Sequence, residues 1–282
     1  MSTEGRVLVD GLMFAEGPRW REDRLWFSDM HALVVMTVDE QGHSERIVDV
    51  PNSPSGLGWL PDGRLLIVSM NDRTLMRREN DGSLTSVADL SALAPYHIND
   101  MIVDAQGRAY IGNFGFRLHD GEEPRSTVLI LVTPDGEARV VADEVWFPNG
   151  MVITPDARTL VVGETFAGTL TAFDIEADGS LANRRTWATL DGAVPDGICL
   201  DAAGGIWVAS PVSAEVLRVE EGGTVTDRIK VSTQAFACML GGADGRTLFV
   251  CTAEDSDPDK CREQRSGRIE AFEVEVARAG LP

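Results

Sequence analysis

The sequence predicts an all-β protein: a six-bladed β-propeller that forms a single domain over residues 1–282. Three observations predict this class. One hairpin-like segment recurs six times, the recurrences occupy the whole chain, and no long segment has the apolar periodicity of a helix. A β-sandwich does not require six equivalent hairpins and a β-solenoid usually has shorter repeats, so neither alternative explains the pattern as well.

Each copy of the repeat consists of a short apolar run, a turn and a second apolar run. The copies span residues 16–29, 55–69, 99–113, 149–164, 196–210 and 237–251. Turns such as Pro61-Asp62-Gly63 suit a hairpin, because aspartate and glycine accept the backbone angles that tight turns need. The residue after each turn recurs at steps of 40, 44, 50, 47 and 41 residues, which matches six blades because 282 divided by six is 47.

The apolar runs have the composition of strands. Residues 64–69, 158–164 and 205–210 are short, rich in β-branched or aromatic side chains and bounded by turn residues. Further strand candidates follow the hairpins, at residues 126–134, 168–176, 214–222 and 267–277. Residues 5–14 form another strand candidate, before the first hairpin. We expect this N-terminal strand to pair with 267–277 in the last blade and so to close the ring of blades. A metal site is expected at the centre of this ring.

The charge of the chain restricts the partners that it can bind. It has 25 Lys and Arg against 45 Asp and Glu, a formal net charge of −20. Phosphate backbones and anionic membranes repel such a chain, so the composition predicts neither a nucleic-acid nor a membrane partner. No apolar run approaches the ~18–20 residues of a spanning helix, and the N-terminus lacks the basic start and apolar run of a signal peptide. We therefore expect a cytoplasmic protein.

The cysteines carry no sign of a metal or disulfide framework. Cys199, Cys238, Cys251 and Cys261 have neither CxxC pairing nor the spacing of metal ligands. In a protein without an export signal, buried reduced thiols are the expected state. No pattern in the chain predicts its oligomeric state.

A ring of residues is predicted at the centre of the propeller. The innermost strand of each blade lines the central channel, so one position per repeat lies at matched height. The position is counted back from the first residue after each hairpin turn, and it lies nine residues earlier, as Ser55 does before Arg64. In the first repeat the turn is one residue shorter, so the offset is eight, from Arg24 back to Glu16. The ring consists of Glu16, Ser55, Asn99, Asn149, Asp196 and Ala237.

The composition of this ring predicts a site for one divalent metal ion. Glu16 and Asp196 supply carboxylates, and Asn99 and Asn149 supply amide oxygens. Oxygen donors without histidine or cysteine favour Ca²⁺, with Mn²⁺, Mg²⁺ or Zn²⁺ as alternatives. Asn-Gly and Asp-Gly are also common turn dipeptides, but here a separate turn follows each within a few residues, which would leave only a stub of strand.

A second layer of residues is predicted to form walls above the ring, because side chains two positions apart in a strand face the same side. The layer consists of Phe14, Ser53, His97, Phe147, Val194 and Ala235. His97 is the most reactive of them, with a direct role in the site and a structural hydrogen-bonded role as alternatives. His31, His43 and His119 have no comparable placement.

Two loops are expected to frame the pocket, at residues 114–126 and 253–266. The charge-mixed stretch 253–267 predicts a solvated loop, since it lacks the glycine and terminal glutamate spacing of a calcium-binding loop.

Four motifs resemble the gluconolactonase/regucalcin (senescence-marker protein) family: FAEGPRW at 14–20, and the segments at 97–115, 147–168 and 195–210. The resemblance extends over nearly the whole chain. It implies a six-bladed propeller with one catalytic divalent metal; paraoxonases and the squid-type diisopropylfluorophosphatase are more distant relatives of similar architecture.

The same resemblance implies roles for individual residues. Glu16, Asn149 and Asp196 match the metal ligands, which agrees with the ring derived from the repeat. Asn99 matches an asparagine that contacts the substrate or, in fluorophosphatase-type relatives, the metal. Asp196 also matches the aspartate proposed as proton acceptor and donor.

Two positions depart from the family pattern. His97 stands where the animal lactonases carry a substrate-binding arginine, and Met101 replaces a glycine that often follows the Asn-Asp pair. Arginine is the better partner for several hydroxyls at once. Together with Phe14, Phe114 and Phe147, these departures imply a substrate less polar than gluconolactone.

The leading functional hypothesis is metal-dependent hydrolysis of a small lactone or a related ester. The metal would polarise the carbonyl, and Asp196 would act as general base and then general acid. Either His97, Asp100 or Asn113 would orient the substrate, and the other expected substrate contacts are Asn99, Phe14, Phe114 and Phe147.

Two alternatives stay open at this point. The same metal site could serve phosphotriester hydrolysis or an enolate-type reaction, since each needs a Lewis acid and a base. A non-catalytic calcium-binding propeller would instead bind metal without hydrolysing any ester.

Overall fold

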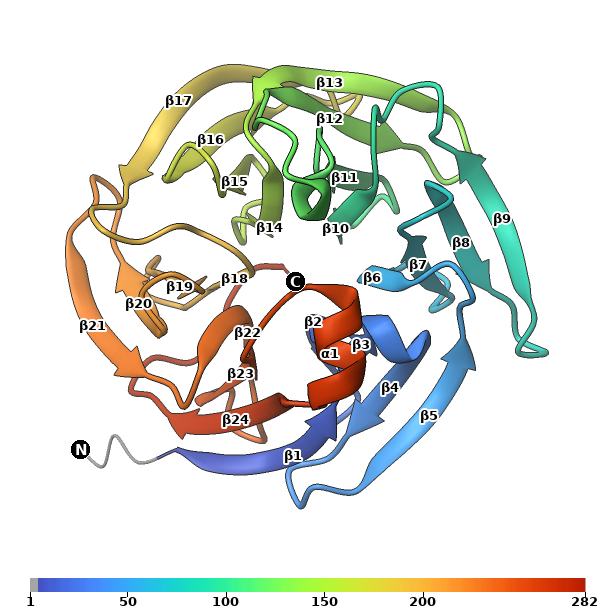
Figure 1. Ribbon diagram of the computed structural model, residues 1–282. Helices are drawn as coiled ribbons and strands as arrows, with labels where there is room; N and C mark the ends of the chain where they lie inside the picture. Colours follow the sequence, from blue (N-terminus) through green and yellow to red (C-terminus); the bar gives the residue numbers. More distant parts are fainter. Residues whose placement is uncertain (1–4, 282) are drawn as a thin grey trace.

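The computed structural model describes residues 5–281 and confirms the six-bladed β-propeller (Figure 1). Over these residues the chain forms six four-stranded antiparallel sheets around a central channel. Residues 1–4 and 282, which the single-domain prediction also covers, lie outside the described part. Five sheets place their first strand at the channel and their last strand at the rim, and in the sixth the N-terminal strand forms the rim.

Three sheets, blades 1 to 3, come from the first half of the chain. Blade 1 comprises β2 (Ala15–Arg21), β3 (Arg24–Asp29), β4 (Val34–Val38) and β5 (Ser44–Asp49). Blade 2 comprises β6 (Pro54–Trp59), β7 (Leu65–Ser69), β8 (Thr74–Arg78) and β9 (Leu84–Asp89). Blade 3 comprises β10 (Ile98–Val103), β11 (Ala109–Asn113), β12 (Thr127–Val132) and β13 (Ala138–Val145).

Blades 4 to 6 complete the circle. Blade 4 comprises β14 (Pro148–Ile153), β15 (Thr159–Glu164), β16 (Thr169–Ile175) and β17 (Leu181–Thr189). Blade 5 comprises β18 (Ile198–Leu200), β19 (Ile206–Ser210), β20 (Glu215–Val219) and β21 (Val225–Lys230). Blade 6 comprises β22 (Gln234–Gly241), β23 (Thr247–Ala253), β24 (Gly267–Glu273) and, as its outer strand, β1 (Arg6–Leu12).

The N-terminal strand closes the ring, as predicted. Strand β1 pairs antiparallel with β24, so that Arg6 lies opposite Ala271 and Leu12 lies opposite Gly267. One blade therefore contains strands from both halves of the chain. Apolar side chains pack the neighbouring blades together; Trp20 of blade 1, for example, stacks on Phe249 of blade 6 with ring centroids 5.2 Å apart.

The innermost strands are irregular where they carry the predicted ring. The pairing register shifts between Glu16 and Arg19 in β2, and an equivalent shift occurs in β6, β10, β14 and β22. Such bulges re-aim a side chain relative to a regular strand. At Gly150, directly after one ring residue, an added Cβ would lie 2.4 Å from the backbone nitrogen of Ile198. The close approach of inner strands at the channel therefore requires glycine there.

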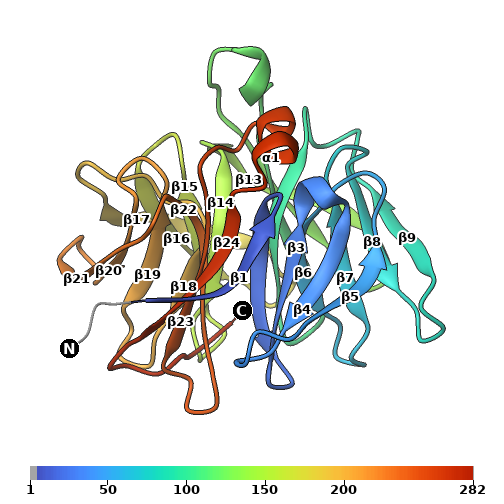
Figure 2. The same cartoon turned by 60° about the horizontal axis from the view of Figure 1, so that its bottom comes forward.

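Within residues 5–281, three short helices lie between strands: η1 (Met30–Ala32), η2 (Leu118–Asp120) and α1 (Pro258–Gln264). Helix α1 and the loop that contains η2 stand above the blades at the same end of the channel (Figure 2). The prediction of a solvated loop at 253–267 was wrong, because α1 forms there. Asp257 caps the helix by accepting hydrogen bonds from the backbone of Asp259 and Lys260, and Pro258 occupies the first turn.

The thiol prediction is confirmed: the four cysteines are free and buried. Within residues 5–281, no helix has the length and apolar character needed to cross a bilayer.

Candidate active site

A cavity of about 760 Å³ opens at the end of the channel that carries α1 and η2. Both predicted framing loops contribute to it, with Leu118 and Asp120 from one and Ser256 and Arg262 from the other. The four predicted oxygen donors of the ring line its floor: Glu16, Asn99, Asn149 and Asp196. The two other ring residues, Ser55 and Ala237, are buried and are not among the lining residues.

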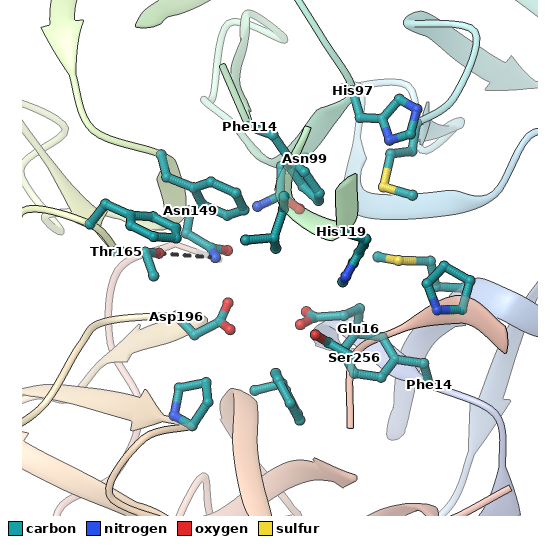
Figure 3. Close-up of a pocket in the computed structure, with 18 of the residues that line it drawn as sticks. Phe14, Glu16, His97, Asn99, Phe114, His119, Asn149, Thr165, Asp196 and Ser256 are labelled. Atoms are coloured by element: carbon teal, nitrogen blue, oxygen red, sulfur yellow. Dashed lines mark hydrogen bonds between the residues drawn. The ribbon is translucent and has the colours of Figure 1, made fainter. Parts of the chain in front are cut away.

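Two carboxylates face each other across this floor. Figure 3 shows the oxygens of Glu16 and Asp196 pointing toward one another across the open centre of the site. Both side chains are largely buried, each at 9% exposure. A backbone N–H from Gly17 donates a hydrogen bond of 2.9 Å to Glu16 Oε2. Among the ion pairs of residues 5–281, none involves either carboxylate.

Burial dominates the electrostatics of this pair. It raises the pKa of Glu16 and, with the added repulsion of the Glu16 charge, holds the pKa of Asp196 well above its usual range. A carboxylate whose ionised form is disfavoured in this way lacks a compensating positive charge. The floor therefore disfavours two uncompensated negative charges, and a bound cation would stabilise the ionised forms of both carboxylates.

The amide of Asn149 is oriented by a neighbouring hydroxyl. Thr165 Oγ1 donates a hydrogen bond of 2.7 Å to the carbonyl of Pro195, so the same oxygen accepts from Asn149 Nδ2 at 3.3 Å (Figure 3). With Nδ2 held by Thr165, the Oδ1 of Asn149 is the atom left free for a ligand. Thr165 thus has a positioning role that the strand repeat alone did not reveal.

Asn99 completes the floor. Its Oδ1 accepts a hydrogen bond of 3.3 Å from the hydroxyl of Ser55, the adjacent ring residue. An amide oxygen has two lone pairs, so the second lone pair and the Nδ2 group are available to a metal or a substrate. Ser55, a ring residue that does not line the cavity, therefore helps to orient Asn99.

The donor set fits a hard divalent cation. Within residues 5–281, no three His, Cys, Asp or Glu side chains gather as a metal site would need, so a cation here would depend on the amide oxygens as well. Two carboxylates and two amides surround the open centre of the floor, and carboxylate and amide oxygens are ligands that Ca²⁺ and related ions accept. Register shifts in β2, β10 and β14 accompany Glu16, Asn99 and Asn149, whereas Asp196 lies in the segment just before β18.

His97 lies in the wall, as the strand alternation predicted. Its ring stacks on Tyr96 with centroids 3.9 Å apart and lies 6.0 Å from the ring of Phe114. Burial, with the positive charge of Arg73 adding to it, lowers the pKa of His97 to about 4. The imidazole is accordingly neutral at pH 7, so it offers a hydrogen bond and an aromatic face but no positive charge.

Two predicted substrate contacts do not line the cavity. Asp100 is buried in an ion pair with Arg19, at 2.7 Å from Oδ1 to Nη2. Asn113 is buried between strands, where it accepts a hydrogen bond from Thr127 and donates one of 2.7 Å to the carbonyl of Val128. The proposed orienting roles of Asp100 and Asn113 are corrected on this basis, because both side chains are used to hold the blades.

Conversely, the cavity includes residues without a predicted place in the site. His31 and His119 both line it, from η1 and η2, although neither had a placement from the repeat. Phe236 lines it in place of its predicted neighbour Ala235, because the register of β22 shifts between Ala235 and Ala237. Position in a loop at the pocket end was the only sequence signal for the two histidines.

Aromatic side chains form much of the remaining surface. Phe14, Phe114 and Phe147 line the cavity, as predicted, and Met30 and Met70 join them. The site therefore combines a small polar floor with broad apolar walls, an arrangement typical of pockets that bind small molecules.

Comparison with known proteins places this geometry in a family. The family model described as SMP-30/Gluconolactonase/LRE-like region matches residues 14–254. The chain is 28% identical to the pentonolactonase XacC of Haloferax volcanii, covering 99% of this chain and 97% of that protein. It is also 28% identical to regucalcin of Xenopus laevis, covering 93% and 91%.

The fold agrees with that of a solved relative. The crystal structure of a calcium-binding protein, regucalcin from Agrobacterium tumefaciens, superposes with a TM-score of 0.82 at 23% identity and covers 99% of this chain and 96% of that one. Because the family model spans most of the chain, including all four floor residues, this protein belongs to the SMP-30/gluconolactonase/LRE-like family.

Proposed function

We propose that the protein is a lactonase that hydrolyses a lactone with the help of a divalent cation held by Glu16, Asn149, Asp196 and Asn99. The observation that carries this proposal is the pair of buried, facing carboxylates at the floor of an open cavity. A relative named as a pentonolactonase, which matches over almost the full length of both chains, supports the reaction class.

A bound divalent cation would neutralise the two carboxylates and polarise the lactone carbonyl. Asp196 takes the proton of the attacking water while the water oxygen bonds to the carbonyl carbon. The ring C–O bond then breaks, and Asp196 returns the proton to the leaving alkoxide, which yields the open hydroxy acid. Asp196 suits this role because its backbone N–H is fixed by a 3.0 Å hydrogen bond to the carbonyl of Ala209.

The other floor residues orient the reactants. Asn99 Nδ2 is free to donate a hydrogen bond to the carbonyl oxygen as negative charge develops on it. Thr165 keeps the amide of Asn149 turned toward the floor through its own hydrogen bond to Pro195. The neutral ring of His97 hydrogen-bonds to the substrate from the wall.

Ca²⁺ is the favoured cation, because carboxylate and amide oxygens suit it and because it accepts flexible coordination geometry. Mn²⁺, Mg²⁺ and Zn²⁺ bind similar oxygen donors and are the alternatives to test. The calcium-binding description of the regucalcin structure from Agrobacterium tumefaciens is consistent with this order.

The test is a hydrolysis assay on chelator-treated protein with a panel of lactones and aryl esters, with each metal added back separately. The expected result is no turnover without metal and restored turnover with one of the four ions. Glu16→Gln should lose this restoration, whereas Asp62→Asn, which alters an exposed turn aspartate, should keep it. Metal binding without turnover of any substrate would contradict the proposal and favour a calcium-binding protein without catalysis.

A further inference from the structure

One side of the cavity is a continuous aromatic surface, the aromatic wall, made by Phe114, Phe147 and Phe166 with Phe116 behind them. The ring centroids of Phe114 and Phe147 are 4.5 Å apart, and those of Phe147 and Phe166 are 5.5 Å apart. Phe116 packs on both Phe147 and Phe166, at 5.9 and 5.0 Å. The wall joins blades 3 and 4 on the side of the floor that carries Asn149.

The wall extends from the floor to the mouth of the cavity. Phe147 is 5% exposed and Phe114 is 9% exposed, whereas Phe166 is 42% exposed. Val212, which also lines the cavity, is 69% exposed. Leaving such side chains in water is unfavourable, so an apolar path from floor to solvent indicates a ligand that covers it.

One residue of the wall has a strained backbone. Phe147 has a φ of +54°, in the left-handed region that bulky residues rarely adopt. Strain of this kind is retained where the surrounding structure requires it, often at binding sites. Here it supports a side chain that lines the cavity two residues before Asn149.

Apolar side chains also lie elsewhere around the cavity. Phe14 and Phe236 pack edge to face with centroids 4.7 Å apart, and Met30 and Met70 belong to the same cluster. Six of the nine core residues of that cluster line the cavity: Phe14, Met30, Met70, Phe114, Phe147 and Phe236. The cavity is therefore flanked by apolar surface beyond the aromatic wall.

Several polar groups above the floor are already engaged with the protein. Asn71 Nδ2 donates to Ser53 Oγ at 3.4 Å, and Gln234 Nε2 donates to the carbonyl of Glu254 at 2.6 Å. The hydroxyl of Thr165 is used by Pro195. These three groups are not free to serve a polyhydroxylated ring, and hydroxyl groups of such a ring that lie against the aromatic faces would be buried without partners, which is costly.

We propose that the substrate is a lactone that carries an apolar alkyl or aryl substituent, with the lactone carbonyl at the floor and the substituent along the aromatic wall. This assignment rests on the proposed lactonase function and specifies its substrate class. A cavity of about 760 Å³ has the size of sites that enclose ligands larger than a single small ring. Burial of each added methylene contributes about a fourfold gain in binding until the wall is covered.

The test measures kcat/KM for γ-lactones whose alkyl substituent lengthens from methyl to octyl, with gluconolactone as the polar reference. The wild-type value should rise by about fourfold for each methylene and then level off. Gluconolactone should be turned over less efficiently than the longer alkyl lactones. A value that does not change with chain length, or a preference for gluconolactone, would overturn the substrate assignment while leaving lactone hydrolysis intact.

Two variants of the aromatic wall test whether the wall binds the alkyl substituent, and a variant on the outer surface serves as the control. Phe166→Ser removes a half-exposed ring, and Phe147→Asn replaces the strained phenylalanine by a residue that accepts a positive φ. In both variants the ratio of kcat/KM for the octyl lactone to that for the methyl lactone should fall about tenfold below the wild-type ratio. Val140→Ser, which removes an exposed apolar side chain from the outer strand β13, should follow the wild type. An unchanged dependence in both wall variants would overturn the proposal.

A binding measurement separates failure of this inference from failure of the proposed function. Calorimetry with hydrolysis-resistant γ-lactams of the same chain lengths reports affinity without turnover. Affinity that rises with chain length supports the aromatic wall as the binding surface, and affinity independent of chain length overturns it. Rising affinity together with no turnover of any lactone would instead overturn the proposed hydrolysis, and with it the assignment of the ligand as a substrate.

Discussion

Two groups of buried carboxylates lie around the channel in contrasting surroundings. Asp100 and Asp201 are each paired with an arginine, at 2.7 Å to Arg19 and 2.6 Å to Arg218. Glu16 and Asp196 face each other at the pocket floor, and no ion pair among residues 5–281 includes them. The two groups are close in sequence: Asp100 directly follows the floor residue Asn99, and Asp201 lies five positions after Asp196.

We infer from this contrast that the arginine-paired carboxylates are structural and that the facing pair would bind a cation. A carboxylate paired with arginine is compensated within the fold, and removal of one partner leaves the other charge buried alone. Two facing carboxylates without a cation disfavour their own ionisation, and such groups concentrate at functional sites. On the proposed function, a cation between the two side chains would stabilise their ionised forms.

The largest effect is expected at the unpaired group. Asp196→Asn should lower kcat/KM for lactone hydrolysis by about a thousandfold or more, because it removes the proton acceptor and weakens the cation site. The melting temperature of the metal-free variant should not fall, since a repulsive charge is removed. Steady-state kinetics and thermal unfolding of the same preparation check both statements. If Asp196→Asn kept more than a tenth of the wild-type activity, the facing carboxylates would not be the functional group.

At the paired group, a substitution should affect folding instead. Asp201→Asn removes the buried partner of Arg218, leaves only the exposed Glu220 at 3.4 Å, and should lower the free energy of unfolding by about 3 kcal/mol. Urea unfolding at constant pH measures this loss, and Asp62→Asn at an exposed turn serves as the control with little expected change. If Asp201→Asn were as stable as the wild type, the paired carboxylates would not be the structural group.

A smaller effect is expected at His31, a third kind of buried group. Burial lowers the pKa of His31 to about 4, against about 6.5 in an unfolded chain. Between pH 6.5 and 4 the unfolded chain thus binds a proton that the folded protein does not, so acidification through this window destabilises the fold. The loss should amount to about 1–3 kcal/mol in all.

His31→Gln removes this contribution while keeping a neutral polar side chain beside the carbonyl of Ser256. Urea unfolding of both proteins at several pH values between 7 and 4 measures the difference. The stability of the variant should decline less steeply on acidification than that of the wild type. Parallel declines would show that His31 is protonated without cost in the folded protein.

Much of the fold and of the floor follows from the repeat. Six equivalent hairpins predict six blades, and the equivalent position in each blade predicts Glu16, Asn99, Asn149 and Asp196 at one depth. Alternation along a strand also predicts most of the wall. It fails at Ala235 because a bulge lies between that residue and Ala237, and bulges depend on contacts with the neighbouring strand.

The rest of the site depends on contacts between distant parts of the chain. Asp100 is taken out of the pocket by Arg19, which is 81 residues away in sequence. His31 and His119 enter it because the short helices η1 and η2 turn over the channel. Helix α1 was recognisable in principle, from the capping pair Asp257-Pro258, but its placement over the cavity depends on packing.

The central claim is that the facing carboxylates form a cation site, and thermal unfolding tests it most directly. Metal-free wild type and Glu16→Gln are compared with and without saturating Ca²⁺, and then with Mn²⁺, Mg²⁺ and Zn²⁺. We predict that metal-free Glu16→Gln melts above metal-free wild type, and that a cation raises the melting temperature of the wild type by several degrees but leaves the variant nearly unchanged. Equal behaviour of the two proteins, or no stabilisation of the wild type by any of the four ions, would contradict the claim.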